Sequence, residues 1–141
     1  MIEQDLGKKL MEVAIEYRSR SYAPYSHFQV GAALLTKDGE IFGGCNIENA
    51  AYTPSNCAER TAIFKAVSEG KKEFSAIAVV GGKADGELQF CSPCGVCRQV
   101  LAEFCDLETF IVYLGTGPDN YQGYLLKELF PFGFGSEDLK L

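Results

Sequence analysis

The chain has 141 residues, of which 47% are hydrophobic and 23% charged, a balance that excludes a disordered or fibrous protein. A chain of this length buries enough surface to fold without disulfides or a structural metal, and we expect residues 1–141 to form a single domain. Nineteen acidic against thirteen basic residues give a net charge of −6. This charge argues against a nucleic-acid polymer as partner, because non-specific binding to phosphates needs a basic surface.

Six cysteines, one histidine (His27) and no tryptophan are the unusual features of the composition. The N-terminal segment MIEQDLGKKL lacks the basic start and apolar core of a signal peptide, and the longest apolar runs, such as Ala76–Val80, are too short to span a bilayer. We therefore expect a cytoplasmic protein with no membrane partner. In a reducing compartment, closely spaced cysteines are more often metal ligands or redox groups than disulfides.

The first half of the chain predicts a helix, a β-hairpin and a second helix. Apolar residues from Leu6 to Tyr17 recur at helical spacing, and Pro24 breaks that pattern. Residues 28–36 are short, apolar and bounded by turns, which is typical of a buried strand, and residues 41–48 follow as its hairpin partner. Residues 56–69 predict the second helix, with Gly70 as its stop.

The second half predicts two strands and two helices. Residues 75–80 and 109–114 are expected as buried strands, and Gly81-Gly82-Lys83 as a turn. Ser92-Pro93 predicts a helix start, with a capping serine before proline at the first helical position, and residues 124–130 predict a short last helix. This order implies a mixed sheet covered by helices, antiparallel at the hairpin and parallel at the later crossovers.

Cys94 and Cys97 lie three residues apart at the start of the third predicted helix. Residues at this spacing share a helix face, so both sulfurs can reach one metal ion. The partial positive charge of a helix N-terminus also favours the thiolate that binds metal. Cys57, at the start of the second predicted helix, can supply a third sulfur in the same way.

Glu59 follows Cys57 by two residues, so both can face one site only if Cys57 is at the helix cap. Three protein ligands and one open position are typical of catalytic zinc, which lowers the pKa of a bound water. A carboxylate beside that water can take its proton and deliver it elsewhere. On this interpretation Glu59 is a neighbour of the metal and not a ligand.

The same residues allow other interpretations. Glu59 could be the reciprocal half of a capping box with Asn56, and a C-x-x-C pair could serve redox chemistry instead of zinc. Cys91, three residues before Cys94, could complete a four-cysteine structural zinc site, although Ser92-Pro93 places the expected helix start after it. The alternative to an enzyme is therefore a non-catalytic zinc module that binds a partner.

Four motifs resemble the zinc-dependent cytidine deaminases. Cys57-Ala58-Glu59-Arg60 and Pro93-Cys94-Gly95-Val96-Cys97-Arg98 resemble the zinc-deaminase signature, in which a His or Cys followed by x-E precedes P-C-x-x-C. His27 is outside the first ligand position, so the chain resembles the three-cysteine variant. Phe28–Ala33, Asn46–Tyr52 and Ser92–Gly95 also match the small homotetrameric class, and the similarity runs to Ser136–Leu139.

The resemblance implies the fold, the reaction and the cofactor. It implies a three-layer α-β-α fold with a mixed five-stranded sheet, and hydrolytic deamination of cytidine and 2′-deoxycytidine to the uridine nucleosides, with release of ammonia, as a step of pyrimidine salvage. Cys57, Cys94 and Cys97 would hold one Zn²⁺ per chain. Glu59 would act first as base and then as acid.

The resemblance also implies the substrate contacts and the assembly. Arg60 would hydrogen-bond the zinc-binding sulfurs and disperse their charge. The residues expected to bind substrate within the chain are Phe28 on the base, Asn46 and Glu48 on the ribose, and the backbone of Ala58. Ala50, Tyr52 and Phe134 would reach into the site of a neighbouring subunit, which implies a homo-oligomer, expected as a tetramer.

Three further expectations concern the substrate, the C-terminal aromatic segment and the remaining cysteines. An alternative is a blasticidin-type deaminase, which would carry out the same reaction on another substrate. The Asn46 and Glu48 pair favours a free nucleoside as the substrate instead. The aromatic segment Phe130–Phe134 is expected to pack on its own core or on another chain. Cys45 and Cys105 are expected to be core residues.

Overall fold

The computed structural model describes residues 2–139, with side chains from Leu6 onward. The helices are α1 (Ile2–Arg18), α2 (Ala58–Ser68), α3 (Gly95–Phe104), α4 (Leu126–Leu129) and the 3-10 helix η1 (Ser136–Leu139). The strands are β1 (Phe28–Thr36), β2 (Ile41–Cys45), β3 (Phe74–Lys83), β4 (Ile111–Gly117) and β5 (Asn120–Leu125). No helix within residues 2–139 is long and apolar enough to cross a membrane.

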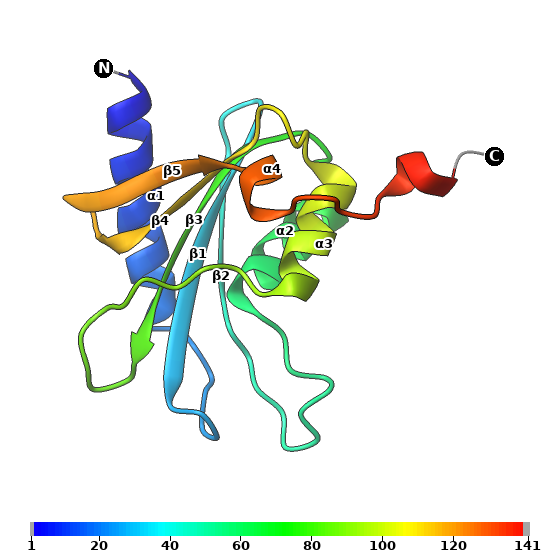
Figure 1. Ribbon diagram of the computed structural model, residues 1–141. Helices are drawn as coiled ribbons and strands as arrows, with labels where there is room; N and C mark the ends of the chain where they lie inside the picture. The colour runs from blue at the N-terminus through cyan, green and yellow to red at the C-terminus, as the bar shows by residue number, and fades with distance from the viewer. Residues whose placement is uncertain (1, 140–141) are drawn as a thin grey trace.

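The five strands form one mixed sheet in the order β2-β1-β3-β4-β5 (Figure 1). β1 pairs antiparallel with both β2 and β3, and β4 pairs antiparallel with β5. β3 and β4 are parallel, and α3 forms the crossover between them. The predicted mixed sheet with an antiparallel hairpin and a parallel crossover is therefore confirmed.

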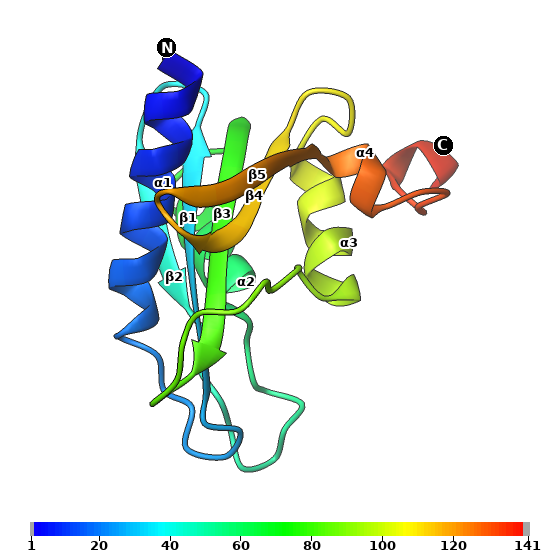
Figure 2. The same ribbon diagram turned by 60° about the vertical axis from the view of Figure 1, so that its left-hand side comes forward.

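Helices cover both faces of this sheet, with α1 on one face and α2 and α3 on the other (Figure 2). Alternate residues of β1 point to opposite faces, as the pleat of a strand requires. Ala33 and Leu35 pack in the core cluster of α1, whereas Ala32 and Leu34 pack in the cluster of α2 and α3. The three-layer α-β-α arrangement is thus built from two separate hydrophobic cores on one sheet.

Two glycines let the helices approach the sheet closely. A Cβ on Gly31 of β1 would lie 1.9 Å from the backbone oxygen of Ala14 in α1. A Cβ on Gly44 of β2 would lie 2.5 Å from the backbone oxygen of Ala58, the first residue of α2. The position of the α2 N-terminus, which carries Cys57, therefore requires a residue without a side chain at position 44, which is Gly44.

Three element boundaries differ from the predictions. β2 ends at Cys45, three residues before the predicted end, because the following segment pairs as isolated bridges of Ile47 with Tyr22 and Asn56. β3 continues through Gly81 and Gly82, which were expected in a turn. The predicted last helix is reduced to Leu126–Leu129, because Tyr124 belongs to β5.

The third helix begins at Gly95 and not at the predicted Ser92-Pro93 start. The Arg98 side chain donates to the Ser92 hydroxyl (2.7 Å) and to the Pro93 carbonyl (2.8 Å). These bonds hold Ser92 and Pro93 ahead of the helix, and Cys94 becomes its N-cap with extended backbone angles (φ −70, ψ 169). The capping-serine interpretation was therefore wrong.

Candidate active site

The N-termini of α2 and α3 each carry a cysteine at the N-cap position. Cys57 caps α2 with φ −78 and ψ 159, and Cys94 caps α3. Neither side chain makes a capping hydrogen bond to its own helix, which leaves both sulfurs available to another partner. Cys57 therefore has the cap position that the prediction for Glu59 required.

The third sulfur comes from Cys97 in the first turn of α3. The Sγ atom of Cys94 lies 3.7 Å from Sγ of Cys57 and 3.6 Å from Sγ of Cys97, and all three lie within 4.8 Å of one another. In a tetrahedral zinc site with Zn–S bonds of about 2.3 Å, two sulfurs are about 3.8 Å apart. The donor set and its spacing therefore fit one Zn²⁺ ion, and Cys91 is not in this cluster.

The thiols of this cluster influence one another strongly. The hydrogen bond with Cys97, and after it the bond from Arg60, lowers the pKa of the Cys57 thiol to about 5. The hydrogen bond to Cys57 raises the pKa of Cys97, because Cys97 keeps its proton beside a thiolate. Three sulfurs at this separation cannot all be thiolates unless a cation lies between them, which again fits a divalent metal.

Glu59 lies in the first turn of α2 and only 4% of its surface is exposed. Burial raises the pKa of its carboxyl to about 7, since a charged carboxylate is disfavoured away from water. The Asn56 capping box is not formed, because the N-cap is Cys57 and the Asn56 amide donates to Thr61 Oγ1 at 3.2 Å. Glu59 instead lines a cavity together with Cys57 and Cys94.

Arg60 follows Glu59 and points its guanidinium at the cluster. Its Nη2 atom donates to Sγ of Cys57 at 3.2 Å, and its Nε atom is buried with no hydrogen-bond partner among the described residues. Although burial opposes it, bonding to Cys57 and Cys97 raises the pKa of Arg60, so the guanidinium is permanently charged. A fixed positive charge beside three sulfurs offsets part of their negative charge.

The cavity beside the cluster has a volume of about 460 Å³ and is lined in part by Asn46 and Val30. The Asn46 side chain is fixed by β1: its Oδ1 accepts from the Val30 amide (2.9 Å) and its Nδ2 donates to the Phe28 carbonyl (2.8 Å). Asn46 thus continues the sheet pairing just beyond the end of β2. Asn46 was expected within the strand predicted over residues 41–48, but β2 ends at Cys45.

Glu48 lies further along the same segment, half-buried, and accepts hydrogen bonds from the backbone of Tyr25 and from Ser26. Phe28 is the half-buried first residue of β1. Its ring lies close to Gly81, because a Cβ atom added to Gly81 would be 3.1 Å from the ring edge. Ser26, which contacts both Glu48 and Phe28, was missed by the sequence analysis. Its only signal was its place in the turn after Pro24.

Ala58 is the fully buried first residue of α2, where a backbone N–H has no acceptor within the helix. The three residues expected to serve a neighbouring subunit are all exposed, with Tyr52 73% and Phe134 57% accessible. Tyr52 also lines the cavity of its own chain. Phe134 instead lies in a groove beside α3, where its carbonyl accepts from Gln99 at 2.7 Å.

The remaining cysteines differ in their surroundings. Cys91 lines the cavity, half-buried, and burial raises the pKa of its thiol to about 11, so it remains protonated. The Cys91 side chain packs against β3, because a Cβ atom added to Gly81 of that strand would lie 2.9 Å from the Cys91 Sγ atom. Cys45 and Cys105 are buried, as expected for core residues.

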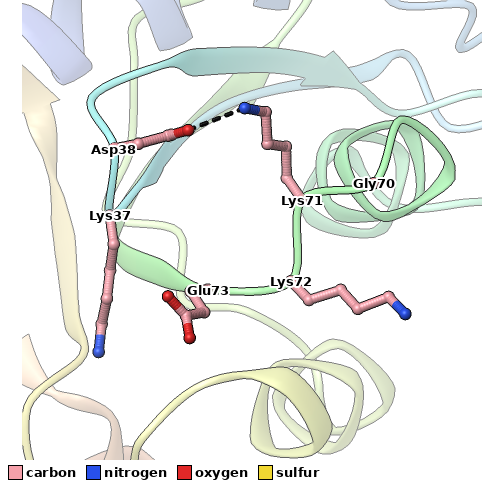
Figure 3. A pocket seen from close by; sticks show the side chains of 6 residues that line it. All are labelled: Lys37, Asp38, Gly70, Lys71, Lys72 and Glu73. Atoms are coloured by element: carbon pink, nitrogen blue, oxygen red, sulfur yellow. Dashed lines mark hydrogen bonds and ion pairs between the residues drawn. The ribbon is translucent and has the colours of Figure 1, made fainter.

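A second cavity, of about 380 Å³, lies at the opposite end of β1, α2 and β3 (Figure 3). Its walls carry Lys37, Asp38, Lys71, Lys72 and Glu73. Lys71 is bound to Asp38 at 2.8 Å and to Glu40 at 3.4 Å, so its charge is already paired. This surface cavity shares no residue with the sulfur cluster.

The α/β fold and a three-sulfur site beside a buried carboxylate place the protein in the class of zinc enzymes. The sequence profile described as the cytidine and deoxycytidylate deaminase zinc-binding region matches residues 4–114. The chain is 52% identical over 130 residues to the cytidine deaminase of Halalkalibacterium halodurans, covering 92% of this chain and 95% of that one. A crystal structure of cytidine deaminase from Burkholderia pseudomallei superimposes with a TM-score of 0.79 at 46% identity, covering 89% of this chain and 97% of that one.

A blasticidin-S deaminase of Bacillus cereus is also similar, at 39% identity over 106 residues, covering 72% of this chain and 74% of that one. The chain belongs to the cytidine and deoxycytidylate deaminase family. The resemblance inferred from the four motifs is therefore confirmed, together with the α/β fold and zinc as the cofactor.

Proposed function

We propose that this chain is a zinc-dependent cytidine deaminase, which hydrolyses cytidine and 2′-deoxycytidine to the uridine nucleosides and ammonia. The observation that carries the proposal is the buried Glu59 carboxyl, which lines the same cavity as Cys57 and Cys94, two of three closely spaced cysteines. The 52% identity to a cytidine deaminase over nearly the whole chain supports the same substrate.

Cys57, Cys94 and Cys97 would hold the Zn²⁺ ion. When bound, zinc supplies Lewis acidity that makes a water molecule nucleophilic at neutral pH. Arg60 stabilises the sulfurs through its hydrogen bond to Cys57, and the two helix N-termini add partial positive charge. The protein thus offsets the charge of three thiolates before any substrate arrives.

Glu59 moves the protons of the reaction. Its carboxylate takes a proton from the attacking water and delivers it to N3 of the cytosine ring, while the water oxygen bonds to C4. The second proton passes through the same carboxyl to the C4 amino group, which leaves as ammonia. Each proton that Glu59 accepts is returned, so the carboxylate is restored at the end of the cycle.

The nucleoside would be bound by residues from three segments. Phe28 would pack on the base, the Ala58 backbone would contact it, and Asn46 and Glu48 would bind the ribose. The hydrogen bonds that fix the Asn46 amide to β1 support this assignment, because a fixed side chain loses little freedom on binding. The two ribose contacts favour a nucleoside over blasticidin S and over a nucleic-acid polymer, which the net charge of −6 also disfavours.

The site would be completed by neighbouring copies in a homo-oligomer, which we propose is a tetramer. Large apolar side chains are exposed in the C-terminal segment, among them Phe132, Phe134 and Leu139. In a copy of this chain, Ala50, Tyr52 and Phe134 would reach the adjacent site. Light scattering after size-exclusion chromatography tests the assembly, and a monomer that is fully active would contradict it.

Three further proposals concern the protein as a whole. We propose that residues 1–141 form one domain, since both hydrophobic clusters share the same sheet. A cytoplasmic location is supported by six cysteines that are all free within the described residues. A nucleoside deaminase in that compartment would serve pyrimidine salvage.

The direct test incubates the zinc-loaded protein with cytidine, 2′-deoxycytidine and blasticidin S in parallel, following the ultraviolet change and the release of ammonia. We expect uridine and 2′-deoxyuridine from the nucleosides, at a higher kcat/KM than for blasticidin S. No turnover of either nucleoside by protein that contains one zinc per chain would overturn the proposal. Faster turnover of blasticidin S would reassign the substrate.

A further inference from the structure

The turn that precedes β1 is joined to the segment that follows β2. The Tyr22 amide donates to the Asn46 carbonyl (3.0 Å), and the Glu48 amide donates to the Tyr22 carbonyl (2.8 Å). The sheet is thereby extended past Cys45 by a short parallel bridge between Tyr22 and Ile47. Residues 22–28 and 46–48 therefore form one connected unit, which reaches the cavity through Asn46.

The Glu48 carboxylate is the centre of this unit. Its Oε1 atom accepts from the backbone amides of Tyr25 (3.0 Å) and Ser26 (3.1 Å), and its Oε2 atom accepts from the Ser26 hydroxyl. Each carboxylate oxygen offers about two acceptor positions. Both positions of Oε1 are thus filled by the protein, whereas Oε2 keeps one position for an outside donor such as a sugar hydroxyl.

The Ser26 hydroxyl makes a second contact on its other side. It accepts from the Phe28 amide at 3.0 Å while its own proton goes to Glu48. A hydroxyl has one proton to donate and two lone pairs, so the two contacts use different parts of one group and do not compete. One side chain therefore joins the carboxylate of Glu48 to the backbone of Phe28.

The backbone between these contacts is held in an uncommon conformation. His27 has a φ of 58, which non-glycine residues rarely adopt. Two hydrogen bonds fix it: the His27 amide donates to the Ala23 carbonyl (3.1 Å), and the Ala84 amide donates to the His27 carbonyl (2.8 Å). This turn brings the Ser26 side chain back over the amide of Phe28. The contact thus depends on a defined turn and not on an exposed serine that happens to lie near.

We propose that Ser26 is a positioning residue of the substrate site, because its hydroxyl orients Glu48 and Phe28 together and leaves one acceptor position on Glu48 for a sugar hydroxyl of the substrate. This inference rests on the proposed function, in which Glu48 meets the ribose and Phe28 the base. Ser26 does not line the cavity that Glu59 shares with Cys57 and Cys94. Its loss is therefore expected to weaken binding and to leave the chemical step nearly unchanged.

The test measures kcat and KM for the zinc-loaded wild-type chain and for Ser26→Ala, Ser26→Thr and the control Ser19→Ala. Ser19 is exposed just after α1, and within the described residues its hydroxyl bonds only to the Glu16 carbonyl. The substrates are cytidine and 2′,3′-dideoxycytidine, which lacks the 2′ and 3′ hydroxyls that could donate hydrogen bonds to Glu48. Thermal unfolding of each variant shows whether it is folded.

We expect Ser26→Ala to raise KM for cytidine about tenfold, the size of one hydrogen bond to a charged group, with kcat within about twofold of wild type. Ser26→Thr, which keeps the hydroxyl, should restore most of the affinity. The rise in KM should be clearly smaller for the dideoxy substrate, since the correct orientation of Glu48 gives it no benefit.

Three results would overturn the inference: an unchanged KM in Ser26→Ala, an equal rise for both substrates, or a fall in kcat as large as the rise in KM. The control separates this inference from the proposed function. If wild type and Ser19→Ala deaminate cytidine and Ser26→Ala behaves as they do, only the role of Ser26 is wrong. If wild type and Ser19→Ala do not deaminate cytidine at all, the proposed function fails and the inference fails with it.

Discussion

The Nη2 atom of Arg60 lies 3.2 Å from the sulfur of Cys57, and the neighbouring Nε atom is buried with no hydrogen-bond partner in the described structure. A buried donor without a partner is costly, and a cluster of anionic sulfurs is the environment that compensates a guanidinium most directly. Arg60 is one residue from Glu59, so its charge acts where the proposed reaction occurs.

Replacement of Arg60 by alanine should lower kcat more than it changes KM. The hydrogen bond joins two charged groups, so we expect a loss of about tenfold or more in kcat. Steady-state kinetics at a measured zinc content checks this, with the exposed Arg20→Ala as the matched control. An unchanged kcat in Arg60→Ala would show that the guanidinium does not balance the charge of the site.

Cys91 and Cys94 should respond differently to alanine. Cys94 lies within 3.7 Å of both other sulfurs, whereas Cys91 is outside the cluster and packs near Gly81. We expect Cys94→Ala to lose zinc and turnover, and Cys91→Ala to keep one zinc per chain and most of its activity. Metal analysis after dialysis measures the difference. Loss of zinc from Cys91→Ala would instead support a four-cysteine structural site.

The cysteine trio shows how far sequence reasoning reached. Spacing predicted that Cys94 and Cys97 can reach one metal ion, and a helix start predicted Cys57 as the third sulfur. The structure places the Cys57 sulfur 3.7 Å from that of Cys94. The start of α3 could not be predicted, because it depends on the Arg98 side chain reaching back to Ser92 and Pro93. The local helix-start propensity of Ser92-Pro93 is overridden here by a contact that exists only in the folded chain.

β5 and Ser26 were missed for different physical reasons. β5 is an edge strand of sequence NYQGYL with mostly exposed or half-buried residues, so it lacks the apolar alternation by which strands are recognised. Ser26 acts through a turn in which His27 has positive φ, a conformation that its residue type does not signal. Both features depend on tertiary contacts rather than on local pattern.

Gly31 should not tolerate a side chain. A Cβ there would lie 1.9 Å from the Ala14 backbone oxygen and 2.5 Å from the Arg18 backbone nitrogen, so α1 would have to move. We expect Gly31→Ala to lower the free energy of unfolding by about 3 kcal/mol or more, as overpacking against backbone does. Gly117→Ala is the control, since its Cβ would meet nothing within 4 Å. Denaturant unfolding compares them, and equal stability of both variants would contradict the close packing of α1.

The ion pair between Lys71 and Asp38 should make stability depend on pH (Figure 3). The hydrogen bond from Lys71 lowers the pKa of Asp38 below its ordinary 3.8, and the bond to Asp38 raises the pKa of Lys71 above its ordinary 10.5. The Asp38 contribution is present above pH 3.8 and is lost as the pH falls through its lowered pKa. The Lys71 contribution is present below pH 10.5 and is lost as the pH rises through its raised pKa.

Lys71→Met should therefore lower the melting temperature at neutral pH, with the difference from wild type disappearing in strong acid. Lys72→Met is the matched control, because Lys72 points away from Asp38 and makes no ion pair within the described residues (Figure 3). Melting curves across the pH range check this expectation. A difference between wild type and Lys71→Met that persists unchanged in strong acid would show that the pair is not its source.

In the proposed reaction, Glu59 carries the protons of cytidine hydrolysis beside a three-cysteine zinc site. The most direct measurement is kcat of Glu59→Gln for cytidine, in protein shown to contain one zinc per chain. Because glutamine keeps the shape of the side chain but cannot exchange protons, we predict a fall in kcat of about 10²- to 10⁴-fold with zinc content and fold retained. A Glu59→Gln protein that deaminates cytidine at close to the wild-type rate would contradict this role of Glu59.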